Sequence, residues 1–349
     1  MSDLLSWALL AAYGLVFVAA SPSSDDAAGF YAGRGRDGRS PGDVTLFATV
    51  FISWIFAKSV TNSANLAAEF GLPGAVAYGA YWLAIPVAGV VVVALRSRFG
   101  ARSLPAWVAG RYGRMAAGAF LLALLIRLYN EVWSNTAVVA TYFGPRQSAA
   151  FYAAALAFTA LTLLYTLKGG LRSSIFTDGV QAALFGLFLV AVVAVGLPAS
   201  AGGVGGRGAD LARMASSGSW TLSGGLDLAL VAVLQSLSYP FHDPVLTDRG
   251  FIAGERATLR AFLWAGVLGF VAIVLFGTVG LPAHLEGLEF DDDAPRVVAA
   301  AVGSGALLLV NVVMLTSAGS TLDSAFSSIA KAVHLDGRRV LHGPRGGAG

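Results

Sequence analysis

Residues 165–181 read YTLKGGLRSSIFTDGVQ, a short basic turn around Gly169-Gly170 between two long apolar runs. Glycine lets the backbone reverse direction there without steric cost. The whole chain is 56% hydrophobic and only 12% charged, whereas soluble domains carry about 25% charged residues. We therefore interpret the two apolar runs as membrane-spanning helices and the turn as the loop that joins them.

Nine apolar runs are long enough to cross a bilayer, whose hydrocarbon core needs roughly 20 helical residues. They cover residues 4–20, 44–70, 73–95, 115–143, 148–167, 173–198, 226–248, 261–282 and 296–331. The first run has no basic leading segment and no clear cleavage site, so we interpret it as a helix rather than a signal peptide. The predicted fold class is an all-α polytopic membrane protein with about nine transmembrane helices.

The positive charges alternate between the two sides of these spans. Of the 23 Lys and Arg residues, 17 fall on one side and four on the other, while Lys58 and Arg127 lie inside spans. Because positive loops stay in the cytoplasm, we expect the N-terminus outside and the C-terminus in the cytoplasm, in the cell (inner) membrane. Residues 21–43 are a predicted cytoplasmic linker, 96–114 a basic segment on the membrane surface, and 199–225 an external loop.

The composition excludes several classes of function. The absence of cysteine rules out disulfides and thiolate metal sites, and the four scattered histidines give no zinc-binding spacing. The net charge of +3 comes from clusters between spans rather than from a nucleic-acid-binding face. The sequence has no nucleophile beside a base and no phosphate-binding loop, so we expect no enzyme, no cofactor and no nucleic-acid partner.

Two of the spans contain polar interruptions. Residues 56–65, FAKSVTNSAN, place hydroxyls and amides where leucine is usual. Residues 239–244, YPFHDP, hold two prolines, each of which removes a backbone donor. Transporters use such breaks, at corresponding positions of two inverted repeats, to direct carbonyls and helix ends at ions and solute. The alternatives are a proline kink that serves packing alone, and a polar seam between helices in the other span.

The last span carries Ser317, Ser320 and Thr321 at i, i+3, i+4 spacing, so these residues share one face. The Ser317 carbonyl and the two hydroxyls are the oxygen ligands that a hard cation prefers. Ordinary packing of Ser and Thr between helices is the alternative.

The fourth span carries Arg127, Asn130, Glu131 and Asn135. An ionisable group at this depth costs roughly 2.5–3.5 kcal/mol, so it usually faces a partner or a cavity. Arg127 and Glu131 lie four residues apart and can neutralise each other. One interpretation is an internal ion pair, and the other is that Asn130, Glu131 or Asn135 contacts a polar solute.

The YTxxGGLxS pattern at 165–173 with Thr177, Asp178 and Gln181, combined with FYAGR at 30–34, resembles the signature elements of the sodium/solute symporter family. The resemblance implies a LeuT-like fold whose ten core helices form two inverted repeats of five. By this match the chain has one extra N-terminal helix and core helices 1 to 8. A partner chain or a lost segment would then supply core helices 9 and 10. The implied divisions are 1–43 as N-terminal helix and cytoplasmic linker, 44–198 as first repeat, 226–333 as partial second repeat and 334–349 as cytoplasmic tail.

The resemblance also implies two binding sites. The cation site would take the carbonyls of Ala57, Val60 and Ser317 and the hydroxyls of Ser320 and Thr321. Asp178 matches an acidic residue that assists cation release, and the segment 235–244 falls where family members line the solute pocket. The candidates for substrate binding are Asn62, Asn130, Glu131, Gln235, Tyr239, Phe241, His242 and Asp243.

Lys58 departs from the family's pattern, because a small or neutral residue usually stands beside the carbonyl of Ala57. Its ammonium would either take the place of sodium or pair with Asp323 or Glu131. Sodium and the proton thus both stay candidate coupling ions, with Asp178, Lys58 and Asp323 as candidates for cation release or coupling. The predicted function is a secondary active transporter that carries a small polar solute with one of these ions by alternating access. The alternative is a symporter-like membrane sensor or structural module that does not transport.

Overall fold

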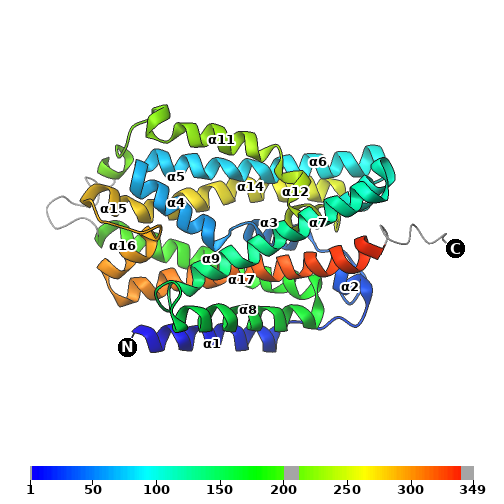
Figure 1. The fold of residues 1–349 in the computed structure, drawn as a ribbon, viewed down its shortest axis with the longest axis horizontal. Helices are drawn as coiled ribbons and strands as arrows, with labels where there is room; N and C mark the ends of the chain where they lie inside the picture. The colour runs from blue at the N-terminus through cyan, green and yellow to red at the C-terminus, as the bar shows by residue number, and fades with distance from the viewer. Residues whose placement is uncertain (1, 200–211, 339–349) are drawn as a thin grey trace.

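The computed structural model describes residues 2–199 and 212–338, and within these ranges the chain is a bundle of helices without strands (Figure 1). Six continuous helical segments are long and apolar enough to cross a membrane, and a bent pair makes a seventh. Two further apolar helices, Leu4–Ala20 and Leu226–Ser236, are shorter. The all-helical membrane fold class is confirmed, and the predicted spans all fall on helices.

The helices follow one another in this order: α1 (Ser2–Ala20), α2 (Ala27–Ala32), α3 (Asp43–Ser53), α4 (Ala57–Phe70), α5 (Leu72–Gly79), η1 (Ala80–Leu83), α6 (Ala84–Phe99), α7 (Leu104–Ala140), α8 (Ala149–Gly169), α9 (Leu171–Ala199), η2 (Leu222–Gly224), α11 (Leu226–Ser236), α12 (Tyr239–His242), α13 (Pro244–Gly250), α14 (Glu255–Gly277), η3 (Thr278–Gly280), α15 (Leu281–Glu286), α16 (Ala294–Val302), α17 (Ser304–Lys331) and η4 (Ala332–Asp336).

Both predicted interruptions are present in the structure. The helices α3 and α4 meet at a bend of 59°, with Phe56 in an extended conformation before α4. The second interruption divides its span into α11, α12 and α13. There Asp243 is extended, and prolines 240 and 244 stand in the first turns of α12 and α13, where the missing N–H of proline has no helical partner to lose. The polar content of residues 56–65 thus lies in α4 itself, directly after the break.

The last predicted span, 296–331, is wrong at its start. Gly303 has φ 134° and separates α16 from α17, so the long buried helix begins at Ser304. Apolarity continues across this glycine, and hydropathy alone therefore merged the two helices. The helix α17 runs through the bundle between α7 and α9 (Figure 1), and all its residues from Val313 to Ala325 are buried.

The Gly-Gly turn joins α8 to α9 through Gly170 alone. Gly170 has φ +56°, and a Cβ there would collide with the carbonyl oxygen of Phe30. Arg172 Nε donates to the carbonyl oxygen of Arg34 at 2.6 Å. The backbone amide of Ser24 donates to the carbonyl oxygen of Lys168 at 3.0 Å. The two signature elements of the sequence therefore pack directly against each other.

Replacing Gly170 with alanine is expected to lower the free energy of unfolding by about 1–3 kcal/mol, because a side chain at positive φ is strained and this one also meets a carbonyl. The measurement is denaturant unfolding of the purified protein in detergent. Gly118→Ala is the control, since Gly118 lies in α7 with open space beside it. Equal stabilities of the two variants would contradict the close approach of the turn to Phe30.

The structure leaves the topology of the chain as a prediction. This applies to the orientation in the membrane, to the surface position of residues 96–114, and to the repeats at 44–198 and 226–333. Within 96–114, α6 ends at Phe99 and α7 begins at Leu104, with a non-helical residue at Gly113. Residues 200–211 of the predicted external loop, which include Arg207, and residues 339–349 of the tail lie outside the described residues.

Candidate functional site

Three predicted cation ligands lie together on one buried face of α17. Ser317, Ser320 and Thr321 are all fully buried. The Thr321 hydroxyl donates to the Ser317 carbonyl oxygen at 3.0 Å, and the Ser320 hydroxyl donates to the carboxylate of Asp178. The face is therefore rich in oxygen, as the spacing in the sequence predicts.

The other two predicted cation ligands, Ala57 and Val60, are fully buried in the first turn of α4. This turn adjoins α17, because the Thr61 hydroxyl lies 3.9 Å from the sulfur of Met314. The structure thus places the five candidates on two adjoining helices, next to the break between α3 and α4. Their convergence on one ion stays a prediction.

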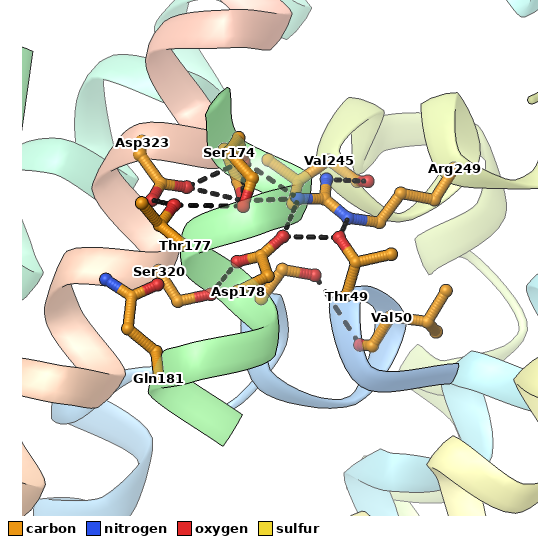
Figure 2. Close-up of polar contacts among 12 residues, drawn as sticks. Thr49, Val50, Ser174, Thr177, Asp178, Gln181, Val245, Arg249, Ser320 and Asp323 are labelled. Carbon is orange, nitrogen blue, oxygen red and sulfur yellow. Dashed lines mark hydrogen bonds and ion pairs between the residues drawn. The ribbon is translucent and has the colours of Figure 1, made fainter. Parts of the chain in front are cut away.

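Asp178 of α9 is the centre of a fully buried ionic network (Figure 2). Its carboxylate accepts from the hydroxyls of Thr49 and Ser320 and from Arg249 Nη2, the last at 2.9 Å. Arg249 Nε donates to the Thr49 hydroxyl at 2.8 Å, and Nη2 donates to Ser324 at 2.5 Å. Four helices, α3, α9, α13 and α17, are joined at this point.

Asp323 of α17 lies in the same network (Figure 2). It accepts hydrogen bonds from Ser174 at 2.7 Å and Thr177 at 2.8 Å. Tyr165 donates a third at 3.1 Å. The Ser174 hydroxyl also lies 3.4 Å from Arg249 Nη2. Two carboxylates thus share one guanidinium, and when all three groups are ionised the network carries one net negative charge. A buried uncompensated charge is unfavourable, so the network favours either a bound cation or a proton on one of its carboxylates.

Arg249 corrects an assignment made from the sequence. The charge count placed it in a loop after the span 226–248, but α13 continues to Gly250 and Arg249 is fully buried within it. The signal in the sequence was Asp178 itself, since a carboxylate inside a predicted span needs a partner. Four hydroxyl partners of the two carboxylates were also missed from the sequence, because their contacts join distant parts of the chain: Thr49, Tyr165, Ser174 and Thr177.

A second group of charges lies where the two interruptions meet α7, and we call Lys58, Arg127, Glu131 and Asp243 the charge cluster. Lys58 Nζ lies 3.3 Å from Glu131, which also pairs with Arg127. Arg127 Nη2 lies 3.5 Å from Asp243. The predicted Arg127–Glu131 pair is confirmed and belongs to a larger set. Among the two partners expected for Lys58, Glu131 is correct and Asp323 is wrong, because the ammonium reaches α7 rather than α17.

Trp54, which the sequence did not single out, links the charge cluster to the first interruption. Its indole N–H donates to Asp243 Oδ2 at 3.0 Å. Asp243 Oδ1 accepts from the amide of Leu246 at 3.0 Å and so caps the start of α13, a role that aspartate often takes. Trp54, which lies between α3 and α4 of one broken span, thus donates a hydrogen bond to the residue that caps α13 in the other broken span.

The predicted solute-binding residues separate into two sets. Glu131 and Asp243 are buried in the charge cluster, and the ring of Tyr239 packs edge-on against Trp54 at 5.1 Å. His242 is half-buried beside the Ser238 hydroxyl at 3.1 Å. The remaining candidates are exposed: Asn62, Asn130, Gln235 and Phe241.

Comparison with known proteins identifies the family of the chain and supports its fold. A family model, the sodium:solute symporter family, matches residues 36–221, just over half of the chain. The chain is similar to a solved structure of a Na+-coupled sialic acid symporter, which is described as a substrate-bound outward-open state with a novel Na+ site. The TM-score is 0.75 and the sequence identity 16%, and the match covers 96% of this chain and 72% of the symporter chain. No curated protein matches the chain. The chain belongs to the sodium:solute symporter family and is a membrane transporter rather than an enzyme.

Proposed function

We propose that this protein carries a small polar solute across the cell (inner) membrane together with sodium, by alternating access. The observation that carries the proposal is the hydrogen bond to Asp178 on α9 from Ser320 on α17, a helix that also packs against α4. Family membership supports coupling to a cation. The similar solved symporter couples Na+ to the polar solute sialic acid, which supports the same kind of coupling here.

The proposed sodium ligands are the carbonyls of Ala57, Val60 and Ser317 and the hydroxyls of Ser320 and Thr321. Because Ser320 donates its proton to Asp178, the lone pairs of its oxygen stay available to a cation. The proton of Thr321 is likewise used on the Ser317 carbonyl. Asp178 would thus orient one ligand and attract the ion when it leaves the site.

The contacts of Lys58 favour sodium over the proton as coupling ion. Its ammonium lies 3.3 Å from Glu131 of α7, and its backbone amide donates to Asn135 at 3.2 Å. The side chain is therefore committed to α7 and does not occupy the hydroxyl face of α17. We place the solute at the two interruptions, beside the charge cluster and Tyr239. In this proposal the broken spans are the first helices of the repeats at 44–198 and 226–333.

The test is a sodium-dependent thermal shift of the purified protein in detergent, with choline chloride replacing sodium chloride at fixed pH. Sodium at 100 times its Kd should stabilise the wild type by about 2.7 kcal/mol. The Ser320→Ala, Thr321→Ala double variant should lose this shift, because two of the five proposed ligands are gone. Thr316→Ala, Ser327→Ala is the matched control, since it removes two buried hydroxyls of α17 outside the proposed ligand set.

Equal melting temperatures in sodium and choline would overturn the sodium site. Uptake of the identified solute into liposomes, with sodium replaced by choline, then checks coupling directly. Unchanged uptake would exclude sodium, and a sodium shift without uptake of any solute would support the alternative of a membrane module that does not transport.

A further inference from the structure

The two carboxylates of the charge cluster have no free hydrogen-bonding capacity toward the outside. Glu131 Oε1 faces Lys58 and Arg127, and Oε2 accepts from Asn135 at 3.2 Å. Asp243 Oδ1 accepts from a backbone amide, and Oδ2 accepts from Trp54 and Arg127. Both side chains are only 3% exposed. A solute that approaches the cluster therefore does not meet its acceptors.

The two cations of the charge cluster differ from the carboxylates in their exposure and in their unused hydrogen-bonding capacity. The side chains of Lys58 and Arg127 are 25% and 20% exposed. An ammonium has three N–H donors and a guanidinium five, and the described contacts of these side chains use one donor of Lys58 and two nitrogens of Arg127. The accessible side chains of the cluster therefore offer donors, because its remaining acceptors belong to the two buried carboxylates.

A face that offers only donors and positive charge selects a solute with acceptors and negative charge. The planar guanidinium matches a carboxylate with two parallel hydrogen bonds, and a neighbouring ammonium adds a point charge. A cationic solute would instead meet two like charges. We propose that the transported solute carries a carboxylate, which Lys58 and Arg127 bind. This inference rests on the proposed transport function and adds the chemical class of the solute.

The charge balance of the site links this solute to sodium. The charge cluster by itself is neutral, with two cations and two carboxylates, so a bound anion leaves one net negative charge. The proposed sodium ligand Ala57 directly precedes Lys58 in the chain. Sodium there compensates the charge of the solute at short range, where the surrounding protein screens little. Each of the two therefore binds more tightly when the other is present, which is the linkage that symport requires.

The experiment compares carboxylates with their uncharged amides in thermal shift. The pairs are acetate and acetamide, lactate and lactamide, benzoate and benzamide, and nicotinate and nicotinamide, each measured in sodium and in choline. We expect at least one carboxylate to raise the melting temperature more than its amide does, with a larger shift in sodium. A protein that responds to sodium but to no carboxylate overturns this inference and leaves the proposed sodium site intact. A protein that does not respond to sodium fails the proposed function instead.

The variant test uses Arg127→Gln, Glu131→Gln, which removes one charge of each sign and keeps the cluster neutral. Binding of the carboxylate found above should weaken at least tenfold. Arg146→Gln is the matched control, because Arg146 is an exposed arginine between α7 and α8, and it should bind as the wild type does. A cooperative unfolding transition confirms that the double variant is folded. Wild-type affinity in that folded variant would overturn the assignment.

Discussion

Replacing Arg249 with glutamine is expected to lower the free energy of unfolding by about 3–5 kcal/mol, the usual result of removing one partner from a buried ion pair. The side chains of Arg249 and Asp178 are fully buried, with Nη2 and Oδ2 2.9 Å apart. Without the guanidinium, Asp178 and Asp323 share a buried network that has no counter-charge. Denaturant unfolding of the purified protein in detergent measures the loss.

Two controls separate charge from packing in this prediction. The Asp178→Asn, Arg249→Gln double variant removes both charges and should recover part of the stability, because Asp178 is then no longer an unpaired buried ion and only Asp323 keeps its charge. Arg260→Gln removes an arginine whose pair with Asp43 is exposed, at 68% and 53% of the two side chains, and should cost less than about 1 kcal/mol. An Arg249→Gln protein as stable as the wild type would contradict a buried pair at Asp178.

The position of Arg249 also bears on the proposed alternating-access cycle. Its contacts join α3 and α13, which are parts of the two broken spans, to α9 and α17. In an alternating-access cycle the broken spans change position relative to the surrounding helices. The proposed movement therefore requires these bonds to break or to move as a unit, and the two-carboxylate network gives the guanidinium more than one partner during the change.

Local patterns were sufficient to predict much of this fold. Span length follows from hydropathy, the second interruption follows from Pro240 and Pro244, and the shared face of Ser317, Ser320 and Thr321 follows from helical spacing. Each of these signals lies within a few residues of the feature it predicts. The boundary at Gly303 failed because apolar residues continue on both sides of the break.

The partners of the buried charges could not be predicted in the same way. Thr49 lies 129 positions from Asp178 in the sequence, and Arg249 lies 71 positions away. Such pairs depend on how the helices pack, and no periodicity in the sequence records that packing. Lys58 is an example. Its charge was compatible with a pair to either Asp323 or Glu131, and the packing of α4 beside α7 is what places its ammonium next to Glu131.

Replacing Trp54 with alanine is expected to lower the free energy of unfolding by about 3–5 kcal/mol, the range for removing a large buried aromatic side chain. Trp54 is 1% exposed. Its ring packs edge-on against Trp82 at 5.4 Å and Tyr239 at 5.1 Å. The alanine variant loses this packing and also leaves Asp243 without the indole donor, so the loss is expected near the upper end of that range. Denaturant unfolding in detergent measures the loss.

Trp54→Phe separates the two costs, because phenylalanine keeps a ring in the space but has no N–H. It should lose about 1–3 kcal/mol, the usual cost when a buried acceptor loses its donor. Trp133→Ala removes an exposed tryptophan of α7 and should change the stability by about 0.5 kcal/mol or less. Equal losses for Trp54→Phe and Trp54→Ala would assign the whole effect to the hydrogen bond. Trp54 would then act mainly by fixing Asp243, the cap of α13, next to the first interruption. Because Arg127 also contacts Asp243, the proposed carboxylate binding should weaken equally in both variants.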